Sequence, residues 1–583
     1  MSAIALLLPL LTLGLPLLLA CGWVLPARWH PWLHRLTALA PLPALLLALI
    51  APADLSLMLP GVLFGGLWLL DSLARALLVA TALLWLLAGL YALRYPLATD
   101  EKTPDDGGQP GGSARRFQVF WLLTLAGNLG LLVSRDIAGF YTCFALMTFA
   151  GYGLVVHTGR AAARRAGRIY LVMAVIGEML ILSGLILAAA GAGAPALQVL
   201  PDAIAGHRHG AWLAALLWLG FGVKAGLAGL HMWLPLAHPV APTPASAVLS
   251  GAMIKAGLLG WLLTLPLGII TLPWAEIALI AALIAALGGA LIGVTQQQAK
   301  AVLAYSSISQ MGLITVIVAA GLIAPGLWPV LGPAALLYAL HHALAKGALF
   351  LGVNGLAPRW RPLLWLPALS LAGLPLTTGA AAKLTMKAGL YDLAFPGLML
   401  WLSLAAVGTT LLMLRFMFCL QREAGDKMPA GLMQGVTMVA VLASVTGVVW
   451  AVPGMGADWG VRWGDAGEVF GLFWPVVVGL IIGGGCWAGA PVRFVRSAQP
   501  TRAASAGVPA GDVVVVIERV VRGIGRLWAR RPGKDWRWEK VVQWEDEHLR
   551  RIGDIAFKLE RHLQRWPIIL FILLALVLAG LLV

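Results

Sequence analysis

Apolar runs long enough to cross a lipid bilayer recur along nearly the whole chain, and they constrain its fold more than any other feature. A helix needs about 20 consecutive, mostly apolar residues to cross the hydrocarbon core. Only 11% of the 583 residues are charged, which is roughly half the fraction found in a soluble domain. The sequence therefore predicts an all-α polytopic membrane protein.

We expect about 16 transmembrane helices. Their predicted centres lie near residues 14, 41, 83, 125, 147, 179, 222, 254, 285, 311, 343, 376, 408, 441, 476 and 574. The first apolar run, from Ala3 to Leu25, follows no basic residue and shows no clear cleavage site. This favours a retained first helix over a signal peptide.

Loop charge predicts the orientation, because cytoplasmic loops of membrane proteins are rich in Lys and Arg. The loop after the fifth expected span holds Arg160, Arg164, Arg165 and Arg168. Alternate loops counted from it hold Arg28, Arg115, Arg116, Arg359, Arg361, Arg422 and Lys427. The intervening loops, near 51–70, 191–211, 265–274, 322–332 and 452–465, are poor in both residue types. We therefore expect a multi-pass protein of a bacterial inner (cell) membrane with its N-terminus outside.

A basic segment, residues 491–565, precedes the last expected span and holds 16 Lys/Arg against 9 Asp/Glu. Within it, Val513–Trp528 and Trp544–Trp566 alternate apolar and basic residues at helical spacing. This pattern is typical of an amphipathic helix on the membrane surface. A solvated cytoplasmic linker fits the composition equally well. Residues 566–583 are expected to form a final anchor helix.

Composition argues against several other classes of protein. The four cysteines, Cys21, Cys143, Cys419 and Cys486, stand in separate apolar runs, which disfavours a disulfide, a zinc site or an iron–sulfur cluster. The net charge of +16 is interpreted as cytoplasmic loop charge rather than a nucleic-acid surface. We expect no metal and no cofactor, and whether the chain is part of an enzyme stays open.

Four lysines, Lys224, Lys255, Lys346 and Lys383, lie deep inside expected spans. An ionisable side chain at that depth costs several kcal/mol unless it is paired or hydrated, so each is a functional-site hypothesis. By contrast, Lys300 stands at a span edge, where its side chain is expected to snorkel to the interface.

Histidines accompany these lysines. His342 and Lys346 are four residues apart, so they share one helix face. His231 and His238 follow Lys224 in a stretch rich in Gly and Pro, which predicts a broken helix. Lysine and histidine can each hold and release a proton when burial and neighbouring charges change. Both His231 and His238 also fit a role as caps of the broken helix.

Three blocks now point to a family: Lys224 to Ser246 with H-x-W-L-P-x-A-H-x-x-A-P-T-P-x-S, Ala304 to Gly312 (AYSSISQMG), and Leu371 to Lys383 (LAGLP…K). In this order they resemble the proton-conducting, antiporter-like membrane subunits of respiratory complex I, Mrp cation/proton antiporters and energy-converting hydrogenases. The resemblance extends over roughly residues 70 to 420.

The resemblance implies a 14-helix core of two inverted five-helix repeats, each with a broken helix. It implies that Lys224 is the pumping lysine of the first half-channel, Lys255 the connecting lysine, His342 and Lys346 members of a central axis, and Lys383 the lysine of the second half-channel. The implied regions are 1–116 (N-terminal transmembrane helices), 117–265 (first repeat and half-channel), 275–420 (second repeat and half-channel), 428–490 (additional transmembrane helices), 491–565 (basic amphipathic cytoplasmic or lateral segment) and 566–583 (C-terminal anchor).

Two positions depart from the family pattern. Ala145 stands where members carry a glutamate that pairs with the first pumping lysine, and Tyr338 stands where they often carry a histidine. Glu178 is the other carboxylate deep in this region. Two interpretations of Glu178 stay open, a substitute partner for Lys224 and a structural role.

Three functions are compatible with the sequence. The first is proton, or cation/proton, translocation as a subunit of a larger complex I-like or hydrogenase-like assembly, with other membrane subunits as partners. The second is a cation/proton antiporter, or an ion-coupled subunit for inorganic-carbon uptake, without redox chemistry and with Na⁺ as a further ion. The third is a membrane scaffold with an impaired proton path, against which the retained buried lysines argue.

Overall fold

The computed structural model describes residues 3–52, 54–59, 65–96, 112–194, 196–423, 429–446 and 466–488. The predicted basic segment 491–565 and anchor helix 566–583 lie outside these residues. The chain divides into two compact units, one of residues 1–57 and 67–511 and one of residues 58–66 and 512–583. All the described helices belong to the first unit.

The described part is almost entirely helical. In chain order its main elements are α1 (Ala3–Gly22), α2 (His30–Leu39), α3 (Leu42–Ile50), β1 (Leu55–Leu59), β2 (Gly66–Leu70), α4 (Ser72–Ala92), α5 (Gly112–Val133), α6 (Ile137–Val155), α7 (Ala161–Ala192), α8 (Leu200–Gly206), α9 (Gly210–Ala225), α10 (Trp233–Val240), α11 (Thr243–Val248), the π-helical turn η3 (Leu249–Met253), α12 (Lys255–Thr264), α13 (Ala275–Gly293), α14 (Ala299–Ile323), α15 (Trp328–Gly355), α16 (Trp365–Ala372), α17 (Thr378–Leu390), α18 (Leu398–Arg422), α19 (Gly431–Val445) and α20 (Ala466–Ala488). Strands β1 and β2 form a two-stranded sheet.

Within the described residues, ten helical segments are long and apolar enough to cross a membrane, and four shorter apolar helices accompany them. The predicted all-α polytopic class is therefore confirmed. Every predicted span centre from 14 to 476 lies in one of these helices, except 376, which falls at the break between α16 and α17. The predicted centre near 574 lies outside the described residues.

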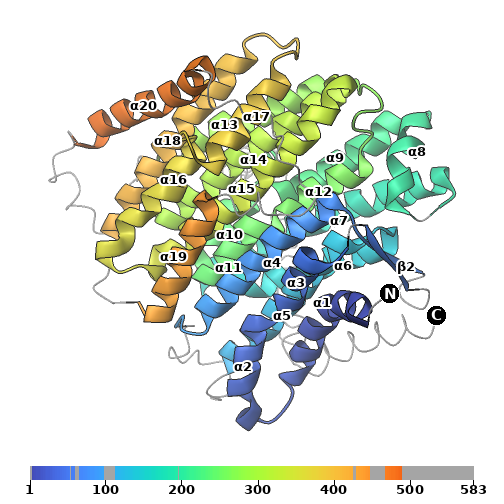
Figure 1. The fold of residues 1–583 in the computed structure, drawn as a ribbon, viewed down its shortest axis with the longest axis vertical. Coiled ribbons are helices and arrows are strands. Elements are labelled where there is room, and N and C mark those ends of the chain that lie inside the picture. Colours follow the sequence, from blue (N-terminus) through green and yellow to red (C-terminus); the bar gives the residue numbers. More distant parts are fainter. Residues whose placement is uncertain are drawn as a thin grey trace, which may run out of the picture. The chain divides into compact units, whose positions relative to one another are not determined.

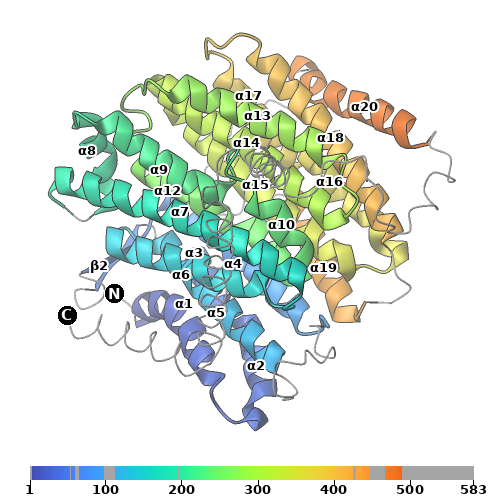
Figure 2. The same cartoon turned by 180° about the vertical axis from the view of Figure 1, so that it is seen from behind.

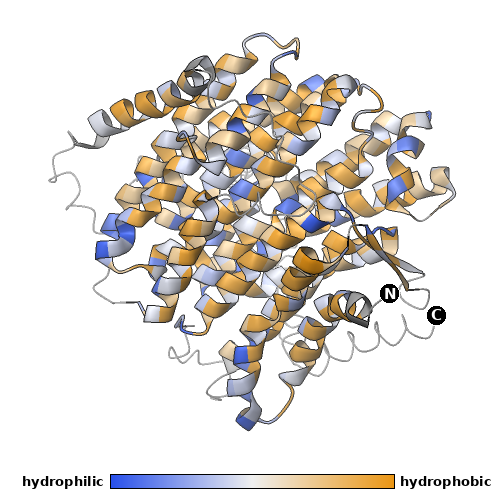
Figure 3. Cartoon of the chain, in the orientation of Figure 1, coloured by the Kyte–Doolittle hydropathy of each residue, from blue (hydrophilic) through white to orange (hydrophobic). Residues whose placement is uncertain are grey.

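Helices α14 and α15 form the middle of the bundle, as both views show (Figures 1 and 2). The apolar window of each is 94% buried, against 39% for α7. Figure 3 shows hydrophobic residues over most of the helices, interrupted by hydrophilic positions. An apolar outer face suits lipid, whereas most polar positions of α14 and α15, among them Gln310, His342 and Lys346, are buried inside the protein.

Two similar runs of helices make up the core. One run is α5, α6, α7, the pair α9 and α10, then α11 to α12; the other is α13, α14, α15, the pair α16 and α17, then α18. In each run the first two helices pack closely together and the fourth is interrupted. A broken helix in each half agrees with the expectation from the resemblance.

Backbone geometry explains both breaks. Helix α9 ends at Gly226, whose φ of +81° is a left-handed conformation that glycine adopts without strain. Helix α16 ends in the same way at Gly373, with φ of +104°. Pro375 and Leu376 follow, and Leu376 has a positive φ of 63°, which is costly for a residue with a Cβ.

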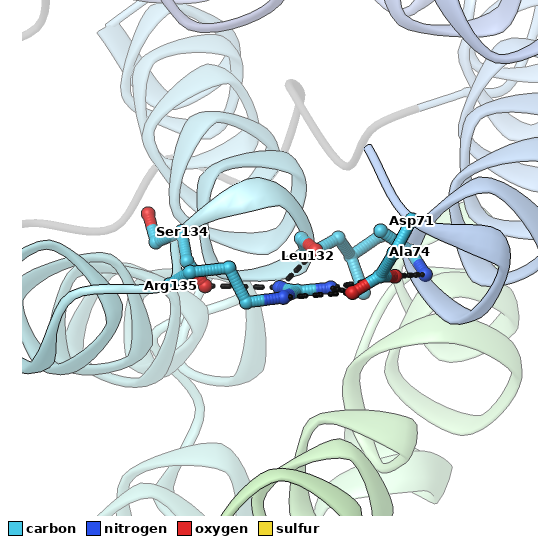
Figure 4. A network of polar contacts seen from close by, with 5 residues as sticks. All are labelled: Asp71, Ala74, Leu132, Ser134 and Arg135. Atoms are coloured by element: carbon cyan, nitrogen blue, oxygen red, sulfur yellow. Dashed lines mark hydrogen bonds and ion pairs between the residues drawn. The ribbon is translucent and has the colours of Figure 1, made fainter. Parts of the chain in front are cut away.

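An ion pair between the buried Arg135 and the half-buried Asp71 joins α4 to the turn between α5 and α6 (Figure 4). The Arg135 guanidinium donates to both carboxylate oxygens of Asp71, at 2.9 Å, and to the carbonyl oxygens of Leu132 and Ser134, each at 3.0 Å. Asp71 also caps α4 by accepting from the Ala74 N–H at 2.7 Å. Arg135 is fully buried, so this fork of charge-assisted hydrogen bonds is what satisfies it.

Candidate functional site: a buried row of lysines and histidines

Lys224 lies in the last turn of α9, just before the first break, with 5% of its surface exposed. Its Nζ donates to Thr148 Oγ1 on α6 at 3.2 Å and to the Tyr170 hydroxyl on α7 at 3.4 Å. The rings of Tyr170 and Trp233 lie 5.6 and 5.7 Å from the ammonium nitrogen, within the range of cation–π attraction. The hydrogen-bond acceptors of the Lys224 ammonium are thus neutral hydroxyl groups.

A cavity of about 20 Å³ adjoins Lys224 and has room for about one water molecule. Its lining includes Thr148, Tyr170, Trp233 and Glu178. Glu178 is 2% exposed, and its carboxylate has the Thr148 and Tyr141 hydroxyls as polar neighbours. The Glu178 carboxylate interacts electrostatically with Lys224. The carboxylate and the lysine therefore share one small polar cavity.

Ala145 does not line this cavity. Thr148, three residues further along α6, supplies the side chain that bonds Lys224. The carboxyl group near Lys224 comes from α7, at Glu178, rather than from α6. This placement is the one required by the substitute-partner interpretation of Glu178.

Lys255 and His342 meet at the centre of the bundle. A hydrogen bond of 2.5 Å joins Lys255 Nζ to His342 Nδ1, and Lys255 also donates to the Ser250 carbonyl oxygen at 3.3 Å. Lys346 lies one turn beyond His342 on α15 and donates to the Leu303 carbonyl oxygen on α14 at 3.0 Å. All three side chains are at most 2% exposed, so Lys255, His342 and Lys346 form a continuous buried group.

His341 extends this group toward the second break, a role that we did not assign from the sequence. The Thr378 hydroxyl donates to the Ser444 carbonyl oxygen and therefore accepts from His341 Nδ1, at 3.1 Å. A neutral His341 then carries its proton on Nδ1 and a lone pair on Nε2. Nε2 is buried with no partner among the described residues. His341 interacts electrostatically with both Lys255 and Lys383, so it links the centre to the second half.

Lys383 lies on α17, beyond the second break, and is 3% exposed. Its Nζ reaches back across the break and donates to the Ala372 carbonyl oxygen, the end of α16, at 2.7 Å. The terminal carbonyls of a helix lack intrahelical donors and carry partial negative charge. The break thus supplies a carbonyl acceptor for the Lys383 ammonium.

The two predicted histidines near the first break differ in their surroundings. His231 Nδ1 donates to the Leu227 carbonyl oxygen at 3.3 Å, which fits the capping interpretation. His238 is fully buried, stacks on Phe350 at a centroid distance of 4.6 Å, and has no hydrogen-bond partner for either ring nitrogen among the described residues. It interacts electrostatically with Lys300 and Lys346.

Two further polar residues bond partners that the sequence did not predict. Lys300 is half-buried at the start of α14 and donates to the Ala241 carbonyl oxygen at 2.7 Å. Tyr338 donates its hydroxyl to Gln310 Oε1 at 3.0 Å, and Gln310 in turn donates to Thr409 Oγ1 at 2.9 Å. Tyr338 is therefore part of a closed structural network that joins α14, α15 and α18.

Two buried ring nitrogens of the row, His341 Nε2 and His342 Nε2, have no hydrogen-bond partner in the described part of the chain. Buried polar groups in folded proteins are nearly always satisfied, by protein or by ordered water. We therefore expect water molecules at these atoms. Water between titratable side chains is what proton transfer along such a row requires.

This geometry defines the class of the protein. It is a polytopic all-helical membrane protein with two broken helices and a buried row of lysines and histidines. Residues 134–413 match the family described as "NADH:quinone oxidoreductase/Mrp antiporter, TM". The resemblance predicted from the sequence is confirmed over this segment, which contains every residue of the row.

Named relatives agree with this assignment. The chain is 31% identical to "Hydrogenase-4 component B" of Escherichia coli (strain K12) over 300 residues, which cover 50% of this chain and 43% of that protein. It is 30% identical to a protein of Rhizobium meliloti (strain 1021) named as a probable K(+)/H(+) antiporter subunit, over 344 residues, 55% of this chain and 32% of that protein. The chain thus matches less than half the length of these two relatives.

Two solved structures share the fold. The Mrp complex from Dietzia sp. DQ12-45-1b superposes with a TM-score of 0.64 at 22% identity, over 95% of this chain and 62% of that chain. The membrane-bound sulfane sulfur reductase, an archaeal respiratory membrane complex, superposes with a TM-score of 0.60 at 19% identity, over 81% of this chain and 99% of that chain.

Proposed function

We propose that this protein moves protons, or a cation together with protons, across the membrane along the buried row. The observation that carries the proposal is the hydrogen-bonded centre of Lys255 and His342, with Lys346 one helical turn away, at the middle of a membrane-spanning bundle. Placing several lysines at that depth is costly, and a proton path gives each of them a role.

In this proposal Glu178 and Lys224 form the first half-channel within residues 117–265. Lys255, His342 and Lys346 connect it to Lys383 in the second half-channel, within residues 275–420. His231 and His238 border the first break. The N-terminal helices up to residue 116 and the helices of 428–490 surround this core.

We further propose that the chain works as one subunit of a hetero-oligomeric complex in a bacterial inner membrane. Support comes from the solved structures that share its fold, both of which are membrane complexes. The N-terminus is proposed to face outward and residues 491–565 the cytoplasm, because loop charge alternates in that sense.

Cation/proton antiport without redox chemistry is the second candidate. The Rhizobium meliloti relative, which is named for K(+)/H(+) antiport, favours it. Proton release and uptake in inverted vesicles, measured with and without added K⁺ or Na⁺, distinguish antiport from proton translocation within a redox complex. A cation requirement in the absence of any electron donor supports antiport.

Lys224→Ala and Lys383→Ala test the shared part of both proposals. In inverted membrane vesicles that contain the full chain and its complex, each variant is expected to lower the rate of proton movement about tenfold or more, the effect of losing one proton-transfer group. Exposed Arg28→Ala serves as the control and should leave the rate unchanged. Unchanged rates in both lysine variants would end the proton-path proposal.

A further inference from the structure

Lys387 lies one turn after Lys383 on α17 and is half-buried where three helices meet. Its Nζ donates to Ser403 Oγ on α18 at 3.3 Å and to the Gly471 carbonyl oxygen on α20 at 3.1 Å. It also interacts electrostatically with Lys383. None of the sequence motifs assigned a role to this lysine.

A proline explains why the Gly471 carbonyl can serve Lys387. Inside an α-helix each carbonyl accepts from the N–H four residues later. For Gly471 that position is Pro475, which lies inside α20 and has no N–H. The ammonium of Lys387 supplies the donor that the helix lacks. Ala380, Leu384 and Leu472 form a small apolar core beside this contact and hold α17 against α20.

The position of Lys387 places it between the buried row and the surface of the chain. Lys383 is 3% exposed, Lys387 is half-buried, and α17 ends at Leu390, directly before Tyr391, which is 78% exposed. By the loop-charge orientation, this end of α17 faces the outside of the membrane. The Lys387 side chain is thus more exposed than that of Lys383 and lies one helical turn nearer to the exposed end of α17.

We propose that Lys387, with the Ser403 hydroxyl and the Pro475-released Gly471 carbonyl, is a proton-release site at the end of the second half-channel. This rests on the proposed function. The Lys383 ammonium gives a proton to the neutral Lys387 amine, directly or through one water. Lys383 becomes neutral, and the new Lys387 ammonium is held by Gly471 and Ser403. It then passes the proton to water at the surface and returns to the neutral amine.

Three variants in the full chain, within inverted membrane vesicles, test this site. Lys387→Met removes the site and is expected to slow proton movement about tenfold. Lys387→Arg keeps the charge and the donors but does not release a proton at physiological pH, so it should be equally slow. A merely structural anchor would instead be rescued by arginine, and that rescue would overturn the proposal.

Pro475→Ala tests the carbonyl separately. It restores an N–H that competes for Gly471 within α20, and we expect proton movement to fall about threefold, since the carbonyl retains a second lone pair. Pro16→Ala in α1, a helix that contains no lysine, is the matched control and should have no effect.

Lys383→Ala, measured in parallel, separates this inference from the proposed function. A strong loss in Lys383→Ala with normal rates in both Lys387 variants would leave the proton path standing and reject the release site. Normal rates in all of these variants would reject both.

Discussion

Most lysines of the row bond backbone carbonyls, and in two cases the local helix geometry explains why an acceptor is available. Lys255 bonds Ser250 within the π-helical turn η3, where the hydrogen-bond register differs from that of an α-helix. Lys383 bonds Ala372 at the end of α16. A carbonyl stabilises an ammonium but cannot take its proton. Lysines held in this way keep their position while the proton remains available to a neighbouring amine, imidazole or water.

Lys224 differs because a carboxylate shares its cavity. A Glu178→Gln substitution keeps the shape of the side chain and removes its charge. If Glu178 takes the place of the glutamate that family members carry at the position of Ala145, this variant should slow proton movement about as much as Lys224→Ala does, roughly tenfold or more. Proton movement in inverted vesicles measures this.

Glu276→Gln is the matched control, because Glu276 is an exposed carboxylate in the first turn of α13 and should tolerate the change. Normal activity in Glu178→Gln would assign Glu178 a structural role.

At the scale of elements, the break between α16 and α17 stores strain. Leu376 follows Pro375 and has φ of 63°, the position and conformation in which a tight turn favours glycine. Its side chain is 84% exposed, so little packing is lost on removing it. Leu376→Gly should therefore stabilise the protein by about 0.5–1 kcal/mol, because relief of left-handed strain exceeds the added chain entropy.

Thermal unfolding in detergent, followed by tryptophan fluorescence, checks this expectation. Leu374→Gly in the same turn is the control, since Leu374 does not have a positive φ, and it should destabilise. A lower midpoint for Leu376→Gly than for the unchanged protein contradicts the strain argument.

At the scale of the whole molecule, the pair of Asp71 and Arg135 joins parts of the chain 64 residues apart. Asp136 adds to this junction by accepting from the Leu67 N–H of β2 at 2.9 Å and from the Gly139 N–H of α6. Asp71→Ala leaves the fully buried Arg135 charge unpaired, which should destabilise the protein by about 3–5 kcal/mol.

The same fluorescence-detected unfolding midpoint measures this loss. Asp202→Ala removes an exposed carboxylate in the first turn of α8 and should leave the midpoint unchanged. Adding Arg135→Met to Asp71→Ala should recover part of the stability, because the unpaired charge is then gone as well. No recovery would show that the ion pair or the Asp71 cap of α4, rather than the stranded arginine, sets the stability.

Much of this architecture could be predicted from the sequence because its signals are local. Long apolar runs define the helices, and the glycines and prolines around Lys224 and Pro375 mark both breaks. The lysines stand out because charge is rare in such runs. His342 and Lys346 were placed on one face by their spacing alone, and the structure places both at the buried centre.

The features that sequence reasoning missed depend on contacts between distant segments. His341 precedes His342 by one residue, so the two side chains point in different directions. The contact of His341 with Thr378 appears only when α15 packs against α17. The bond from Lys300 to the Ala241 carbonyl depends on where α10 ends relative to α14. The Gly471 carbonyl oxygen can accept from Lys387 only because α20 packs beside α17. Pro475, which leaves that carbonyl without its helical donor, is visible in the sequence.

The scarcity of carboxylates in the described interior has an electrical consequence. Glu178 lies near one end of a row that otherwise contains lysines and histidines, so each proton bound further along adds positive charge with no nearby anion to offset it. Moving one such charge through the full thickness of the membrane changes its energy by about 2.3 kcal/mol per 100 mV. If the row carries protons as proposed, the voltage across the membrane, as well as the difference in pH, is expected to set how many protons it holds.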